Sequence, residues 1–240
     1  MTPEQYQATR ARASLGLLGA LRPLARLLRP RPTPAQWAAW VGSAYPAVYR
    51  ARIDHHAAAR EFYLAERSRF GVSGPTPVPL RNYPPQALAT ALEEEHVRSR
   101  LEALEDGDPV PTVIVDQALA IADRHGAAGG RDAIVDAVRH DRRALGYART
   151  TMGLENCAFC LLLVSRGPVY RDEEAALLRD GTGEPYHDRC DCIAVPVYDR
   201  TDWPGRDEYL QMETAWREHG GDLQSWRRYI ADREQADQAP

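Results

Sequence analysis

The sequence predicts a mainly α-helical protein that carries one small α+β module toward its C-terminal end. Through the first 150 residues, apolar residues recur at helical spacing. After residue 150, short apolar runs alternate with turn residues, and all four cysteines of the chain gather there. We therefore expect a helical region over residues 1–150, a small Cys/His module over 151–200 and a helical tail over 201–240.

The composition is that of an ordinary globular protein, with one unusual feature. The chain has 240 residues, of which 44% are apolar and 27% charged, enough to build a sizeable core. It contains no lysine, so all 30 basic residues are arginines. A preference for bidentate contacts would not remove lysine from every solvated position. The absence of lysine therefore indicates the codon usage of a high-GC genome.

Charge is distributed unevenly along the chain. Residues 5–53 hold eight arginines and no acid, whereas residues 54–240 hold 22 arginines against 33 acids. A basic segment on an acidic body suggests contact with something acidic, such as nucleic acid or a partner subunit. An amphipathic helix with a solvated arginine face explains the same pattern, and both interpretations stay open.

The N-terminal residues do not resemble a secretory signal or a membrane anchor. No basic residue precedes Arg10, and the apolar run that follows is interrupted by Arg22 and Arg26. We therefore expect a protein of the cytosol with no membrane contact. Reducing conditions there disfavour disulfides, so clustered cysteines indicate metal binding or catalysis.

The first predicted helix carries a leucine stripe. The leucines recur at spacings of four, three and four residues, at Leu17, Leu21, Leu24 and Leu28. Pro23 lies within this stretch. Because proline lacks a backbone N–H and clashes with the preceding turn, we expect it to kink the helix or to begin a new one.

A proline-rich connector near residues 30–34 leads into a second helix. Thr33 is a suitable N-cap, and Gln36 stands three residues later, where a capping box requires Glu or Gln. We expect this helix to run as far as Gly71, with an interruption at Pro46.

A second proline-rich connector near residues 75–85 precedes the remaining helices. The segment GAAGG at residues 126–130 is expected to separate two of them, because glycine is a poor helix former. The expected helices are 86–105, 112–126, 131–150, 206–220 and 222–233.

The cysteines and one histidine form a pattern typical of a zinc site. Cys157 and Cys160 form a C-x-x-C pair, which lets two thiolates from one turn reach the same tetrahedral ion. His187 and Cys190 are also three residues apart, and Cys192 follows Cys190 by two. We expect zinc to take four of these five ligands: Cys157, Cys160 and Cys190, with His187 or Cys192 as the fourth.

Three other interpretations of this pattern remain open. Reduced cysteines can pack as small apolar residues, disulfides can form, or a cysteine can act as a nucleophile with His187 as its base. Ser165 stands close to the motif as another candidate nucleophile. The sequence contains no Walker loop, G-x-G-x-x-G, G-x-S-x-G or H-E-x-x-H motif.

Two other polar clusters have simpler interpretations. His55 and His56 are adjacent in a predicted helix and so point about 100° apart, which does not make a metal pair. We expect them to be solvated or to lie at the edge of the core. The acids of residues 93–95 are expected on a solvated helix face.

The cysteine region resembles a known family. CAFCLLLVSRGPVY, followed by YHDRCDC, is similar to the C-terminal motif of the Mu protein F-like minor head proteins of tailed bacteriophages, in the version found in phages of high-GC hosts. The similarity is strongest over residues 129–198. The wider family reads H-P-x-C-R-C where this chain has HDRCDC at residues 187–192, without that proline and arginine.

The resemblance implies a head-morphogenesis protein, and we expect it to be a non-enzymatic structural protein. Such a protein contacts the portal, scaffold or major capsid protein during procapsid assembly in the host cytoplasm. It then stays in the virion, in the capsid interior or at the portal vertex. Any DNA contact is expected to lack sequence specificity.

Two alternatives of other classes remain. Relatives of this type are also labelled capsid maturation proteases, although no protease motif in this sequence supports that function. The arginines of residues 10–52 instead suggest a zinc-stabilised nucleic-acid-binding module.

Overall fold

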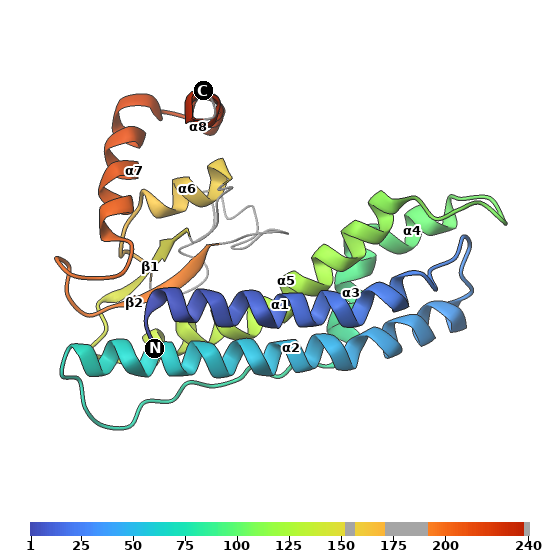
Figure 1. Ribbon diagram of the computed structural model, residues 1–240, viewed down its shortest axis with the longest axis horizontal. Helices are drawn as coiled ribbons and strands as arrows, with labels where there is room; N and C mark the ends of the chain where they lie inside the picture. The colour runs from blue at the N-terminus through green and yellow to red at the C-terminus, as the bar shows by residue number, and fades with distance from the viewer. Residues whose placement is uncertain (152–156, 171–191, 238–240) are drawn as a thin grey trace. The chain divides into compact units, whose positions relative to one another are not determined.

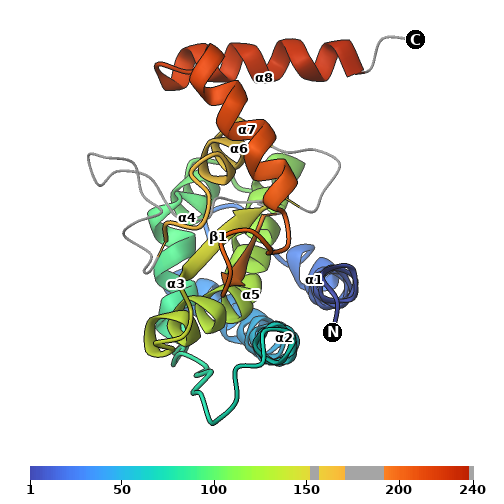
Figure 2. The ribbon, with the colours of Figure 1, turned by 90° about the vertical axis from the view of Figure 1, so that its left-hand side faces the viewer.

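The computed structural model describes residues 1–151, 157–170 and 192–237, which form eight helices and two strands (Figures 1 and 2). Backbone contacts divide these residues into two compact units. Unit 1 comprises residues 1–62 and 79–133, and unit 2 comprises 63–78, 134–151, 157–170 and 192–237. The expected fold class, mainly helical with a small sheet, is confirmed. None of the described helices combines the length and apolar character needed to cross a bilayer.

Helix α1 (Pro3–Ala25) begins at a capping box. The Gln5 amide donates to the Thr2 hydroxyl at 3.3 Å, and the Thr2 amide donates to the Gln5 side chain at 2.8 Å. The leucine stripe is buried as expected at Leu17, Leu21 and Leu28, with Leu24 half-buried. Pro23 lies in the last turn, and the helix ends two residues later without a new one beginning.

Helix α2 (Pro34–Arg69) confirms the predicted start but not the interruption. The Thr33 amide donates to Gln36 Oε1 at 2.8 Å, and the Gln36 amide donates to Thr33 Oγ1 at 3.2 Å. Pro46 lies inside a continuous helix of 36 residues. The buried side chains of Val41 and Val48 on either side of it show why: tertiary packing, more than local propensity, stabilises long helices.

The helix expected over residues 86–105 is broken into α3 (Pro85–Glu94) and α4 (Val97–Glu102). His96 lies between them in the left-handed region, with φ of 63°. In one continuous helix, Leu92 and Val97 would point about 140° apart. The break lets both side chains be fully buried.

Helix α5 (Thr112–His140) runs straight through the GAAGG segment, so the expected division is wrong. The glycines allow close packing against α2. A Cβ at Gly129 would lie 2.3 Å from the carbonyl oxygen of Arg52, and one at Gly130 would lie 2.8 Å from that of His55. Within unit 1, these glycines are required by the approach of two helices and do not terminate either one.

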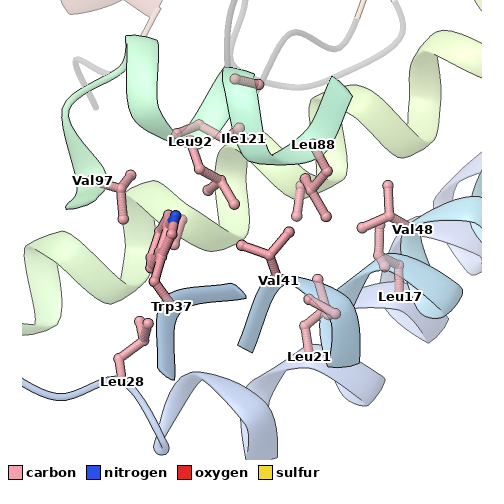
Figure 3. Close-up of a cluster of buried hydrophobic side chains, with 14 of the residues drawn as sticks. Leu17, Leu21, Leu28, Trp37, Val41, Val48, Leu88, Leu92, Val97 and Ile121 are labelled. Atoms are coloured by element: carbon pink, nitrogen blue, oxygen red, sulfur yellow. The ribbon is translucent and has the colours of Figure 1, made fainter. Parts of the chain in front are cut away.

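The helices of unit 1 enclose one apolar core, and Figure 3 shows how side chains from α1, α2, α3, α4 and α5, and from the turn after α1, point toward one another there. The labelled members are Leu17, Leu21, Leu28, Trp37, Val41, Val48, Leu88, Leu92, Val97 and Ile121.

Unit 2 contains a two-stranded antiparallel sheet of β1 (Gly146–Thr150) and β2 (Ile193–Val197). The register pairs Gly146 with Val197 and Thr150 with Ile193, and every residue of both strands is buried. The helix expected over residues 131–150 is therefore wrong in its last part. Residues 146–150 form a strand because their pairing with β2 and their complete burial outweigh the local helical pattern.

Three helices complete unit 2: α6 (Ala158–Val164), α7 (Arg206–His219) and α8 (Leu223–Asp237). The two tail helices are confirmed. Trp226 of α8 is fully buried against α6 and α7, and its indole N–H donates to the Ala158 carbonyl at 2.7 Å.

Candidate functional site

The structure brings the two halves of the cysteine motif together in unit 2. Cys160 lies in the first turn of α6, and Cys192 immediately precedes β2. Helix α6 lies beside β1, the strand that pairs with β2 (Figure 1). Their Sγ atoms are 3.7 Å apart although 32 residues separate them in sequence. Both residues are at least 97% buried, with exposed fractions of 3% and 1%. The two sulfurs thus form one buried pair.

Cys157 is the N-cap of the same helix. Its Sγ accepts a hydrogen bond from the Cys160 amide at 3.3 Å, while the residue itself stays exposed. A sulfur held at a helix start by a backbone donor is the arrangement that a C-x-x-C metal knuckle requires, because both sulfurs then leave the same turn.

A buried arginine lies beside the pair. Arg149 is the fourth of the five residues of β1, is fully buried, and donates from Nη1 to the Cys192 sulfur at 3.5 Å. Burying a cation is costly unless negative charge lies near it. A thiolate at Cys192 would place negative charge directly beside this guanidinium.

The sulfur–sulfur distance discriminates between two chemistries. A disulfide would hold the sulfurs about 2.05 Å apart. Two thiolates bound at about 2.3 Å to one tetrahedral zinc ion would lie about 3.8 Å apart. The observed 3.7 Å fits the second geometry. Reduced cysteines in van der Waals contact fit it as well, so the distance alone does not separate metal from packing.

Two of the five predicted ligands, His187 and Cys190, lie outside the described residues. Among the residues that the structure does describe, no group of three or more His, Cys, Asp or Glu side chains is placed to hold a metal ion. The described part of the site therefore consists of Cys160 and Cys192, with Cys157 one turn away. Spacing alone did not decide between Cys192 and His187 as the fourth ligand. The structure places Cys192 beside Cys160.

Ser165 is not placed to act as a nucleophile. It caps the C-terminal end of α6, is 93% buried with an exposed fraction of 7%, and donates its hydroxyl to the Leu162 carbonyl at 2.7 Å. A nucleophilic serine instead needs an accessible hydroxyl and a neighbouring base.

A second polar cluster in unit 2 has no counterpart in the sequence analysis. Asp141 Oδ2 accepts from Arg67 Nε at 2.7 Å and from the hydroxyls of Tyr63 and Tyr198 at 2.9 and 3.0 Å. Its Oδ1 accepts from the Arg143 amide at 3.0 Å. Burial by itself would raise the pKa of Asp141, but these hydrogen bonds hold it below its ordinary value. The cluster joins residues far apart in sequence, so no local pattern indicates it.

His55 belongs to the core of unit 1, and the expectation of a solvated or core-edge residue is wrong. It is fully buried, and burial, aided by the charges of Arg10 and Arg131, lowers its pKa to about 3. One ring nitrogen lies 3.4 Å from the Ser14 hydroxyl. His55 is therefore neutral at physiological pH.

Comparison with known proteins identifies related phage proteins. The Gene 15 protein of Mycobacterium phage L5 is 28% identical over 254 residues, covering 91% of this chain and 85% of the relative. The Gene 15 protein of Mycobacterium phage D29 is 27% identical over 237 residues, covering 85% and 83%. No solved structure matches. The expectation of a phage protein is thereby confirmed. Because the model of the VG15 protein family matches residues 2–219, the chain belongs to the VG15 family.

Proposed function

We propose that this protein is a minor head protein that acts in procapsid assembly through contacts with the portal, scaffold or major capsid protein. Its homology to the Gene 15 proteins of two mycobacteriophages supports a role in a phage. The observation that carries the proposal is the contact between Cys160 and Cys192. The two halves of the motif that resembles Mu protein F-like head proteins thereby belong to one folded module.

We further propose that zinc stabilises this module. Cys160 and Cys192 are two of the ligands, and the other two come from Cys157, His187 and Cys190. The buried charge of Arg149 offsets the negative charge that a zinc–thiolate centre carries. A segment of this size usually needs such a staple, and the free energy of zinc binding then contributes directly to folding.

Incorporation into procapsids tests the assembly role directly. The full-length chain would be co-expressed with the portal, scaffold and major capsid proteins of the same phage, and procapsids would be separated by sedimentation. We expect the chain to sediment with procapsids and to be absent from that fraction when the shell protein is omitted. Deleting α1 is not a clean test, because Tyr6, Leu17 and Leu21 belong to the core of unit 1.

Other outcomes would favour the alternatives. A chain that never sediments with procapsids contradicts the assembly role. Cleavage of the co-expressed head proteins that disappears in Cys157→Ala would indicate a maturation protease. Binding to nucleic acid without any binding to head proteins would indicate a nucleic-acid module.

A further inference from the structure

An apolar groove lies in unit 1, where the end of α1 and the start of α2 meet α4. Its volume is about 240 Å³, and its walls include Leu24, Leu27 and Leu28 together with Trp37 and Trp40. Sites that enclose small ligands measure about 300–1,000 Å³. This groove is smaller and suits the anchoring side chains of a larger molecule.

Hydrogen bonds and a ring stack hold the walls of the groove in place. The indole N–H of Trp40 donates to the Leu24 carbonyl at 2.9 Å, and its ring stacks on that of Trp37 at 5.6 Å. The amide of Arg31, in the connector, donates to the Leu101 carbonyl of α4 at 3.0 Å. A groove held in this way is preorganised, so little ordering cost opposes binding.

Leu27 marks the groove as a binding surface. Its side chain is 58% exposed although it lines an apolar depression. Leu24 and Trp40, which line the same depression, are only half-buried. Covering these three side chains would remove apolar surface from water, which is favourable in proportion to the area.

The charge of the groove wall indicates what covers it. Arg29 lines the groove, is exposed and forms no ion pair within the described part of the chain. Most of the lining comes from the segment of residues 5–53, which holds eight arginines and no acid. By contrast, Arg31 pairs with Glu105 at 3.0 Å and Arg50 with Asp54 at 3.1 Å. A cation in the groove wall, within a segment that holds no acid, favours a ligand that brings carboxylates.

We propose that the groove docks an acidic amphipathic helix of another head protein. Apolar side chains on one face of that helix fill the groove, and a carboxylate beside them meets Arg29. This proposal depends on the proposed function in one respect, which is that the partner is sought among the other head proteins. A peptide is favoured over nucleic acid because Trp37 is 96% buried, with an exposed fraction of 4%, and cannot stack on a base.

The test uses the full chain and synthetic peptides of about 20 residues, each long enough for a helix of about 30 Å. The peptides tile the portal, scaffold and major capsid proteins of the same phage, and binding is measured by the anisotropy of a dye on the peptide. We expect the bound peptides to be acidic and to carry apolar residues at helical spacing.

Two pairs of variants locate the binding. Leu27→Asp places an acid in the groove and should weaken peptide binding about tenfold or more. Leu15→Asp, on an exposed side chain of α1 outside the groove lining, is the matched control and should bind as the wild type does. Arg29→Gln should weaken binding and flatten its dependence on salt between about 50 and 200 mM. Arg12→Gln is its control, and circular dichroism verifies that each variant folds.

Each alternative result overturns the proposal. It fails if no peptide binds, if the bound peptides are neutral or basic, or if Leu27→Asp and Leu15→Asp bind equally. Self-association lost in Leu27→Asp would make the occupant a second copy of the chain. DNA binding that the arginine variant loses, with no peptide bound, would make it nucleic acid.

The procapsid experiment separates this proposal from the proposed function. If the chain enters procapsids but binds no peptide, the proposed assembly role stands and the proposed docking in the groove is contradicted. If the chain binds acidic peptides through the groove but never enters procapsids, the docking stands and the assembly role is contradicted.

Discussion

The two units of the molecule are stabilised in different ways. Unit 1 is an assembly of amphipathic helices around an apolar core, and its helices approach closely where glycines allow it (Figure 3). Both units also bury polar side chains: Arg10, Arg52, His55 and Arg131 in unit 1, and Glu66, Arg67, Asp141 and Arg149 in unit 2. What distinguishes unit 2 is that the buried Asp141 carboxylate accepts from four donors, and that Arg149 lies beside the buried pair of Cys160 and Cys192. Apolar packing tolerates many substitutions, whereas a buried polar group depends on each of its partners. We therefore expect unit 2 to respond more sharply to single polar changes.

Asp141→Ala should have the largest effect on stability. The change leaves the Arg67 guanidinium and the Tyr63 and Tyr198 hydroxyls without their shared acceptor, at a cost of about 3–5 kcal/mol. Asp54→Ala is the control, because its pair with Arg50 is exposed and should contribute less than about 1 kcal/mol. Urea unfolding followed by tyrosine and tryptophan fluorescence measures both. Equal losses in the two variants would show that the buried cluster is no more important than a surface ion pair.

The Asp141 carboxylate should also make the stability of the folded protein depend on pH. Its pKa in the folded protein lies below the ordinary value of 3.8. The stabilisation it provides is therefore complete above pH 3.8 and is lost as the pH falls through the lower folded pKa. The wild type should lose stability over this acidic range more steeply than Asp141→Ala.

Gly129→Ala should have the next largest effect on stability, and it tests the helix packing of unit 1. The added methyl would lie 2.3 Å from the Arg52 carbonyl oxygen, so the helices must separate, at a cost of about 1–3 kcal/mol. Gly19→Ala, in an α1 position with open space around it, should instead stabilise the helix by about 0.5–1 kcal/mol. Thermal unfolding of the two variants gives the comparison. Stabilisation by both changes would mean that α5 and α2 do not approach as closely as the structure indicates.

The sequence predicts those parts of the fold that local pattern determines. The capping box at Thr33 and Gln36, the leucine stripe of α1 and the two tail helices are all confirmed. The GAAGG segment misleads because glycine serves two purposes, ending helices and permitting helices to touch, and only the partner helix distinguishes them. Strand β1 and the break at His96 likewise depend on partners distant in sequence.

The candidate site was predictable to the same extent. Spacing identifies Cys157 and Cys160 as a pair, because both lie on one turn. The proximity of Cys160 and Cys192 depends on how α6 lies beside the sheet, and the proximity of Arg149 to Cys192 depends on the register of β1 with β2. The Asp141 cluster follows no local rule at all, since its members come from three separate segments.

The central claim is that a zinc ion, and not packing alone, stabilises the cysteine region of unit 2. The variant that tests it is Cys160→Ser, with Ser165→Ala on the same helix as its control. Loss of the Ser165 hydroxyl removes only a bond to a carbonyl one turn back and should cost little. Cys160→Ser should lose bound zinc while the helices of unit 1 stay folded.

The most direct measurement combines elemental analysis of the purified protein with hydrogen–deuterium exchange before and after chelation. We expect about one zinc ion per chain. After chelation, exchange should accelerate in α6 and β2 and stay unchanged in α1 and α3, and untreated Cys160→Ser should show the same pattern. Metal-free protein whose α6 and β2 are as protected as before, with no response to the chelator, would contradict the account.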